Sequence, residues 1–258
     1  MNNKKGPVSI AVLLLAAAFF IYTFYDFITS PATIIMQMDG DGVKNYFTFL
    51  YHCLYEKGVW FHGMNYPYGE NVVFTDGQPF LSVPISYLSS VLHFSTETLL
   101  TIMHLLITAS FVVAMVYVHK ILRLFNVEQP LAIFFSALII LLSPQIFRLT
   151  GHFALSYCCV VPMVFYWLIQ YHITNKLKYA LYLYLIGAVA VFAHPYFLAM
   201  LMLWVGFYSV GYFLFTRNSI KQKVLHISPV LLSFAGVFAT FKLYLIATDP
   251  IKDRPTFP

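Results

Sequence analysis

The sequence has few charged residues, and this shortage limits the kind of protein that it can encode. Of its 258 residues, 15 are Lys or Arg and 10 are Asp or Glu, which is 10% of the chain. A soluble domain usually carries about a quarter of its residues as charged side chains. Apolar residues make up 60%, so a disordered or collagen-like chain is excluded. We therefore expect an integral membrane protein.

Cysteine is also scarce, with only Cys53, Cys158 and Cys159 in the chain. Neighbouring cysteines rarely bridge each other, and Cys158–Cys159 lies within an apolar run. These residues predict neither a disulfide framework nor a metal site. We interpret them as small packing residues.

Apolar runs close to the length of a membrane-spanning helix, about 20 residues, recur along the chain. We predict seven spans: Val8–Phe27, Thr98–Val118, Leu131–Phe147, Phe153–Tyr171, Tyr179–Ala193, Phe197–Phe215 and Leu225–Ala247. The two runs beside His194-Pro195 also fit one broken helix, which would reverse the orientation of everything after it. The expected fold class is all-α, a polytopic helical bundle forming one transmembrane domain over residues 1–258.

Residues 28–97 are more polar and predict a long loop with structure of its own. Apolar residues at Val43, Phe47, Leu50 and Leu54 have the spacing of one helix face. Val43–Lys57 is therefore predicted as an amphipathic interfacial helix that stops at Gly58. The turn sequence NYPYGEN follows. The apolar stretch Phe80–Phe94 is too short to span and predicts a second interfacial or re-entrant helix.

The basic residues predict the orientation of the bundle. With seven spans, nine of the 15 Lys and Arg residues lie on the side of the N-terminus: Lys4, Lys5, Lys120, Arg123, Lys176, Lys178, Arg217, Lys221 and Lys223. Basic residues in short loops mark the cytoplasmic face. We expect a cytoplasmic N-terminus and an outward-facing long loop, with membrane lipid and no nucleic acid among the partners.

This orientation gathers polar residues on the outer side: Asp39, Asp41, His62, Tyr68, Glu70, Asp76, Arg148, His152 and His194. Ionisable groups at membrane depth are costly unless they pair, line water or bind a ligand. The pattern predicts one outward-facing cavity, with Glu70, Asp76 and His194 among its substrate-binding residues. A purely structural His194 beside Pro195 is the alternative.

Asp39-Gly40-Asp41 is the first candidate for chemistry. The two carboxylates can converge on an oxygen-preferring cation, Mg²⁺ or Mn²⁺. One of them can instead serve as a general base. In the third interpretation, Asp41 caps the helix that begins near Val43.

The second candidate is SPQIFRLTGHF, residues 143–153. Pro144 and Gly151 break the helix at the outer surface, where Arg148 and His152 project. A guanidinium suits a phosphate, which it grips with two parallel hydrogen bonds. Arg148 and His152 are therefore candidates to bind a phosphate. The alternative is an Arg148 side chain that only extends toward the membrane surface and a His152 that caps a helix.

The layout resembles the C-type membrane glycosyltransferase superfamily, GT-C. The matching parts are the first span, MDGDGVKNYF (Met38–Phe47), the helix Val43–Lys57 and the stretch Phe80–Phe94. The stretch MNYPYGENVVFTDGQP (Met64–Pro79) is similar to a motif of uncharacterised bacterial multispan proteins. The resemblance implies transfer of a sugar from a polyprenyl-phosphate-linked donor to an acceptor at the outer face of the plasma (inner) membrane. It also implies that Asp39 or Asp41 is the base toward the acceptor hydroxyl.

The resemblance has one departure and two rivals. Members of the superfamily commonly run longer and carry a large outer domain, and the polar, Pro-rich tail Asp249–Pro258 predicts a further domain after residue 258. A transporter or flippase for a lipid-linked sugar or anion is the first rival. A non-catalytic subunit of a larger membrane or envelope assembly is the second.

Overall fold

The computed structural model describes residues 10–251, and they are almost entirely helical. The helices are α1 (Ile10–Thr23), α2 (Tyr25–Thr29), α3 (Gly40–Tyr55), α4 (Pro79–Leu92), α5 (Thr96–Leu124), α6 (Gln129–Leu141), α7 (Val160–Thr174), α8 (Leu177–Ala193), α9 (Tyr196–Phe215) and α10 (Ile220–Thr248). Three 3-10 turns accompany them: η1 (Val72–Phe74), η2 (Ile146–Thr150) and η3 (Phe153–Ser156). Within the described range the only strands are β1 (Trp60–Phe61) and β2 (Glu70–Asn71), an antiparallel pair. The all-α prediction is confirmed.

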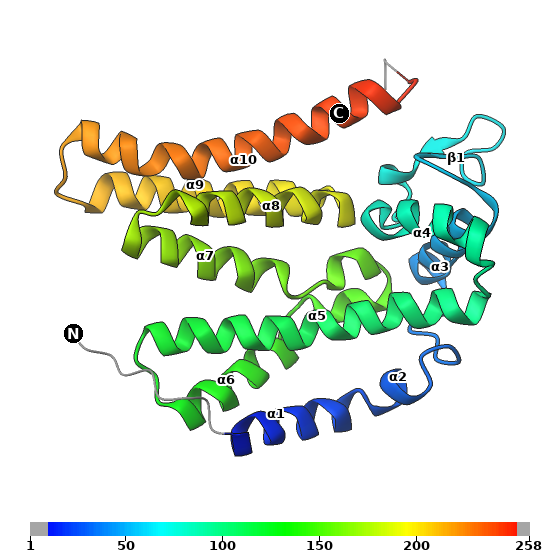
Figure 1. Ribbon diagram of the computed structural model, residues 1–258, viewed down its shortest axis with the longest axis horizontal. Helices are drawn as coiled ribbons and strands as arrows, with labels where there is room; N and C mark the ends of the chain where they lie inside the picture. The colour runs from blue at the N-terminus through cyan, green and yellow to red at the C-terminus, as the bar shows by residue number, and fades with distance from the viewer. Residues whose placement is uncertain (1–9, 252–258) are drawn as a thin grey trace.

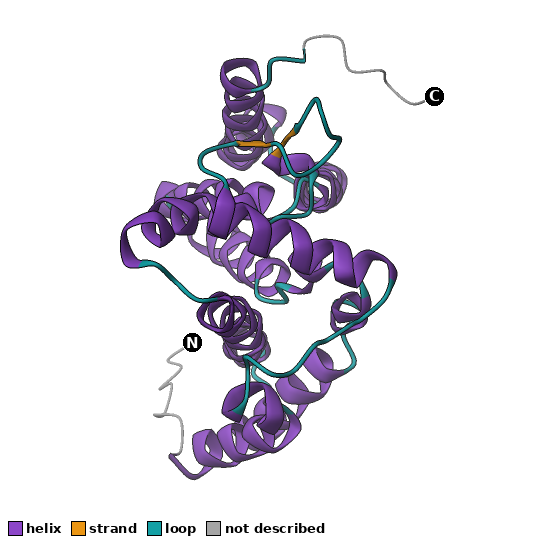
Figure 2. Ribbon diagram, turned by 90° about the vertical axis from the view of Figure 1, so that its right-hand side faces the viewer, coloured by secondary structure: helices purple, strands orange, loops and turns teal. Residues whose placement is uncertain are grey.

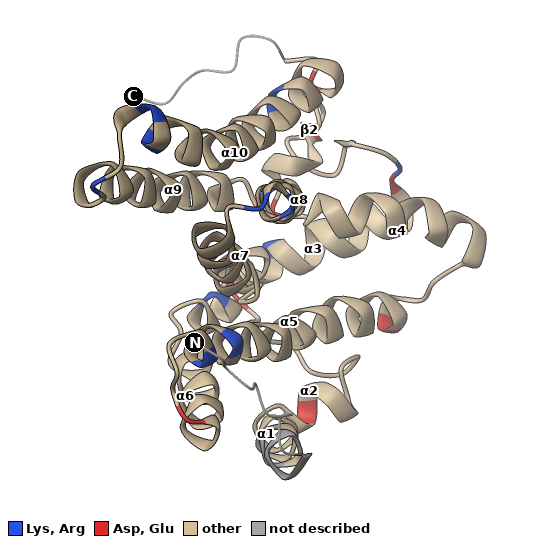
Figure 3. Ribbon diagram, turned by 60° about the vertical axis from the view of Figure 1, so that its left-hand side comes forward, with Lys and Arg blue, Asp and Glu red and all other residues tan. Residues whose placement is uncertain are grey.

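The long helices run side by side, and their connections gather at two ends (Figure 1). At one end lie the turns α5–α6, α7–α8 and α9–α10, and the basic residues that the sequence clusters there surround them (Figure 3). We call this the basic end. At the other end, here called the site end, α3, α4 and the strand pair lie across the bundle, whose helices are seen end-on in Figure 2.

Four stretches of the described chain are long and apolar enough to cross a membrane: Thr96–Leu124, Gln129–Thr150, Tyr196–Phe215 and Ile220–Thr248. The chain is therefore a helical membrane protein. α8 is apolar but has 17 residues. The first predicted span, Val8–Phe27, begins outside the described residues, and α1 together with the start of α2 covers its remainder.

Two predicted spans run well past the helix that the structure has at that place. Leu131–Phe147 is not one helix, because α6 ends at Leu141, shortly before Pro144. A proline disfavours helical backbone in the residue before it and has no N–H to donate. Phe153–Tyr171 begins as the turn η3, and the helix α7 starts only at Val160.

The pair of runs beside His194-Pro195 is two helices. α8 ends at Ala193 and α9 begins at Tyr196, and both pack against α10 and against each other. His194 between them has extended backbone, with φ −159° and ψ 132°. The chain therefore reverses here, and the single broken helix is ruled out.

Helices are present at both predicted places in residues 28–97. α4 covers the stretch Phe80–Phe94 and carries Pro84 within it. α3 begins three residues before Val43 and ends at Tyr55, so Gly58, with φ +80°, belongs to the turn toward β1 and not to the helix stop. The predicted turn is also confirmed, since the N–H of Tyr68 donates to the carbonyl of Asn65 over 2.9 Å.

The face of α3 that is buried within the protein is not the apolar face that the sequence assigns to the membrane interface. Val43 and Phe47 are 49% and 42% exposed. The buried residues are instead mostly polar or aromatic: Asn45, Tyr46, Thr48, Phe49, His52 and Cys53. Some of their polar atoms pair with other segments: His52 Nε2 lies 2.9 Å from the carbonyl of Gly58, and the side-chain amide of Asn45 donates to the carbonyl of Gly151. The spacing of apolar residues does not reveal a buried face that is built largely from polar and aromatic side chains.

The core of the bundle is built on α5, α7, α8 and α9. Its fully buried residues include Met103, Phe111, Tyr171, Leu183 and Phe197. All three cysteines are free, and Cys53 and Cys158 are buried among these apolar residues. Their predicted packing role is confirmed.

Candidate functional site

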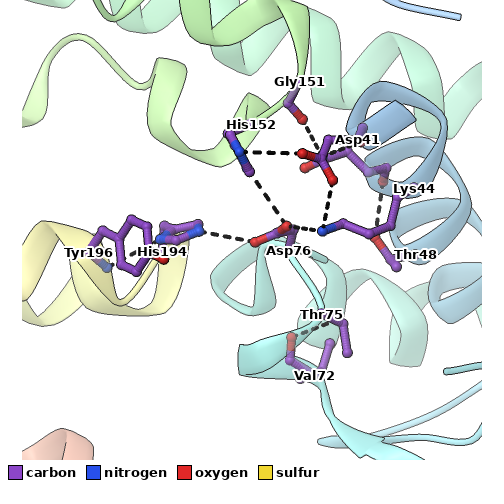
Figure 4. Close-up of polar contacts among 11 residues, drawn as sticks. Asp41, Lys44, Thr48, Val72, Thr75, Asp76, Gly151, His152, His194 and Tyr196 are labelled. Atoms are coloured by element: carbon purple, nitrogen blue, oxygen red, sulfur yellow. Dashed lines mark hydrogen bonds and ion pairs between the residues drawn. The ribbon is translucent and has the colours of Figure 1, made fainter. Parts of the chain in front are cut away.

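Five ionisable side chains meet at the site end (Figure 4). They are Asp41 and Lys44 of α3, Asp76 before α4, His152 between η2 and η3, and His194 between α8 and α9. We call them the aspartate–histidine cluster. Four separate parts of the chain contribute to it, so the tertiary fold creates the site.

Lys44 joins the two carboxylates of the cluster. Its Nζ lies 2.7 Å from Oδ2 of Asp76 and 3.3 Å from Oδ1 of Asp41. Asp41 and Lys44 are three residues apart on α3, a spacing that makes helix side chains neighbours. The long stem of Lys44 then carries its ammonium to the loop that holds Asp76.

His194 presents a defined proton to Asp76. Its Nδ1 accepts the N–H of Tyr196 over 3.2 Å, so Nε2 carries the hydrogen and donates to Oδ1 of Asp76 over 3.0 Å. The first residue of α9 thereby fixes which ring nitrogen faces the carboxylate. His194 is buried, which protects this pair from water.

His152 lies between the two aspartates. Its Nε2 is 3.5 Å from Oδ2 of Asp41, and its Nδ1 is 3.9 Å from Oδ2 of Asp76. These distances are longer than those of His194. His152 can therefore approach either carboxylate with a small movement.

Backbone contacts hold these segments in place. The side-chain amide of Asn45 donates to the carbonyl of Asp41 over 2.6 Å and also to the carbonyl of Gly151, which ties the η2–η3 turn to α3. Gly40 starts α3 at φ +48°, and Asp76 has φ +60°. A left-handed backbone at a residue other than glycine is costly and collects at functional sites.

Asp76 is held in its ionised form. Burial by itself would raise the pKa of this carboxyl, but the hydrogen bonds from His194 and Lys44 outweigh it and lower the pKa to about 2. For Lys44, burial works toward a lower pKa, while Asp76 and Asp41 together raise it above its ordinary value. Asp76 is therefore a weak proton acceptor near neutral pH.

A pocket of about 180 Å³ opens beside the cluster. It is lined by Asp39, Gly40 and Asp41 on one side and by Phe147, Arg148, Thr150, Gly151 and His152 on the other. The side chain of Asp41 is about half exposed, at 51%. Arg148 is exposed, and its side chain forms no hydrogen bond or ion pair with any residue in the described range. The unpaired guanidinium of Arg148 thus lines the same pocket as the carboxylates of Asp39 and Asp41.

Residues 13–252 match a domain of unknown function, DUF6311. The chain belongs to this family. No curated protein and no solved structure matches it. The function of this DUF6311 chain is therefore argued from the geometry of its site.

Most of the residues proposed from the sequence come together in the DUF6311 structure. Asp39, Asp41, Arg148 and His152 line one pocket, and Asp76 and His194 adjoin it through the cluster. Glu70 does not join them. It lies buried on β2, where its carboxylate accepts from the side chain of Asn65 over 3.0 Å and from the N–H of Asn71 over 2.9 Å. These two hydrogen bonds stabilise the turn between β1 and β2, so the Glu70 carboxylate has a structural role.

The structure corrects one expectation, about Asp41, and adds one site residue, Lys44. Asp41 does not cap the helix, because the N-cap position is Asp39 and Asp41 stands in the first turn with its carboxylate toward Lys44 and His152. Lys44 was not proposed as a site residue from the sequence. The three-residue spacing of Asp41 and Lys44 could have indicated an ion pair between them, but nothing in the sequence places Asp76 beside Lys44.

The predicted magnesium or manganese finds no support in the side chains described. Residues 10–251 contain no group of three or more His, Cys, Asp or Glu side chains suited to hold a metal ion. The ammonium of Lys44 already lies against Asp41, and the carboxylate of Asp39 accepts from the side chain of Gln37. These donors do not fit a cation site.

Proposed function

We propose that the protein is a membrane glycosyltransferase that moves a sugar from a polyprenyl-phosphate-linked donor to an acceptor on the outer face of the membrane. One observation carries the proposal. Asp41 and the unpaired Arg148 line the same pocket at the site end. A carboxylate that takes a proton and a cation that receives a phosphate are the two groups that this reaction needs.

The proposal includes an orientation in the plasma (inner) membrane of a bacterial cell. α1 and α5 to α10 form seven spans, the basic end faces the cytoplasm, and the loop with α3 and α4 lies outside. The basic turns at one end support this orientation. α6 and α7 have 13 and 15 residues, about 20 Å each at 1.5 Å per residue, against about 30 Å of hydrocarbon. The turns η2 and η3 complete them at the site end, which puts the pocket at the level of the outer membrane surface, within reach of a lipid phosphate.

The reaction can be written on the residues of the pocket. The acceptor hydroxyl oxygen bonds to the anomeric carbon of the donor sugar and passes its proton to Asp41. The bond from that carbon to the phosphate oxygen breaks, and the polyprenyl phosphate leaves with the electron pair. Arg148 stabilises the negative charge that develops on the phosphate, and His152 beside Asp41 assists.

Asp41, not Asp76, is assigned as the base. Asp76 already accepts from Lys44 and His194, and its pKa of about 2 makes it a poor proton acceptor. Asp41 is more exposed and lines the pocket directly. Asp76 is a positioning residue, since it holds Lys44 and His194 in place.

The test is sugar transfer by the purified chain in liposomes that contain a polyprenyl-phosphate sugar. Asp41→Asn is expected to lower the rate at least a hundredfold, which is the low end of what a positioned acid or base contributes. Asp26→Asn is the matched control, because Asp26 lies on α2 and does not line the pocket. An unchanged rate in Asp41→Asn would show that Asp41 is not the general base. Movement of the donor across the bilayer without any transfer would instead favour the flippase, and activity only with a larger co-purifying chain would favour the subunit.

A further inference from the structure

An apolar groove of about 380 Å³ lies between α9 and α10, beside the turn that joins them at the basic end. Its walls include Val210, Phe213 and Leu214 of α9 and Val224, Ile227 and Leu231 of α10. Leu214 is 66% exposed and Val224 is 54% exposed. The groove therefore opens on the outside of the bundle, where a membrane protein meets acyl chains.

Basic residues stand at the mouth of this groove. Lys221 precedes Val224, Ser228 and Leu231 by three, seven and ten positions, so it extends the same face of α10. Arg217 lies in the connecting turn. Both are exposed, and neither side chain forms a hydrogen bond or ion pair with another residue in the described part of the chain.

The third basic residue near the turn, Lys223, is bound to α9. Its Nζ donates to the carbonyl of Phe213 over 2.6 Å and lies 5.1 Å from the centre of the Phe213 ring. No acidic residue occurs in the sequence between Glu128 and Asp249. The positive charges of Arg217 and Lys221 are thus not balanced by nearby acids of α7 to α10.

We propose that this groove binds an anionic phospholipid, with an acyl chain along the apolar walls and the headgroup phosphate between Arg217 and Lys221. The two positive charges of Arg217 and Lys221 favour an anionic lipid over other occupants. A zwitterionic lipid would leave two cations unbalanced, and a second copy of the chain would bring like charges together at a cost. The proposal uses the orientation given above, in which the basic end lies at a membrane surface, but it does not depend on sugar transfer.

The test compares lipids of equal chain length on the purified full chain in detergent. Phosphatidylglycerol is expected to raise the unfolding temperature and to remain bound in native mass spectrometry, whereas phosphatidylcholine and inorganic phosphate are not. The double variant Arg217→Gln/Lys221→Gln is expected to weaken phosphatidylglycerol binding about tenfold or more. The matched control is Lys176→Gln/Lys178→Gln, which removes the same charge from the α7–α8 turn at the same end.

Three results would overturn the proposal. Equal stabilisation by the two lipids would show that the charge has no role. An equal loss in the control pair would place the effect in the net charge of the basic end. A dimer that Val224→Trp dissociates, with no bound lipid, would make the groove an interface between copies. If instead Val224→Trp keeps its helical content by circular dichroism and loses bound phosphatidylglycerol, the groove is the site.

Discussion

His194 and Asp76 are 118 positions apart in the chain, and their Nε2 and Oδ1 atoms are 3.0 Å apart. The contact joins the α8–α9 turn to the loop before α4. It also lowers the pKa of Asp76 to about 2, together with Lys44 and against the effect of burial. This pair therefore links the α8–α9 turn of the bundle to the loop region of the site end.

The first prediction concerns pH and stability. The carboxyl of Asp76 has a pKa of about 2 in the fold and 3.8 ordinarily, so its stabilisation is fully present above about pH 4 and is lost as the pH falls through 2. The difference corresponds to about 2 kcal/mol. We expect the unfolding temperature in detergent to fall over this window. Asp76→Asn is expected to be less stable at pH 7 and to lose this part of the pH dependence, and a variant with the wild-type profile would contradict the assignment.

The second prediction concerns Arg148. Removal of one well-placed cation or donor from a developing negative charge costs about a hundredfold in rate, and we expect that loss in Arg148→Ala. Arg148→Lys should recover part of it, because the charge returns without the paired hydrogen bonds. The unfolding temperature should not change, since the side chain is exposed. A large loss of stability would show that Arg148 serves the fold instead.

The third prediction concerns Asn45, which ties α3 to the η2–η3 turn through the carbonyls of Asp41 and Gly151. Asn45→Ala leaves the buried Gly151 carbonyl without this donor, at a cost of about 1–3 kcal/mol. Asn218→Ala is the control, because Asn218 donates to the hydroxyl of Tyr212 at an exposed position. Chemical or thermal unfolding of both variants measures the difference. Equal effects would mean that the tie to Gly151 adds nothing.

The fourth prediction concerns the two ends of the bundle. Introduced cysteines at exposed Met38 and Thr150 should react from the outside with a membrane-impermeant maleimide, and one at Asn218 only after the cells are opened. The native cysteines are buried or partly buried and give a low background. If Met38→Cys and Thr150→Cys were labelled from opposite sides of the membrane, Asp39 and Arg148 could not line one pocket, and the proposed site would be wrong.

The sequence by itself determined the class of the protein and most of its helices. Few charges and long apolar runs are consistent only with a helical bundle in a membrane, and Pro, Gly and Asn mark the places where helices stop. Local spacing also placed Asp39, Asp41, Arg148 and His152 at helix ends, because a membrane restricts ionisable groups to those levels. Helix bounds within residues 129–160 were less accurate, since apolarity continues through Pro144 while the hydrogen-bonded helix does not.

Only the tertiary structure decided which of these residues touch. Nothing in the sequence distinguishes Lys44 from other basic residues, but in the fold its Nζ lies 2.7 Å from Asp76. Glu70 is a candidate by sequence, but in the fold its carboxylate is bound within the hairpin. The buried face of α3 was likewise set by partners such as Gly151, which no spacing on α3 records. Helix periodicity is a local property of the chain, whereas pairing between side chains depends on how distant segments pack.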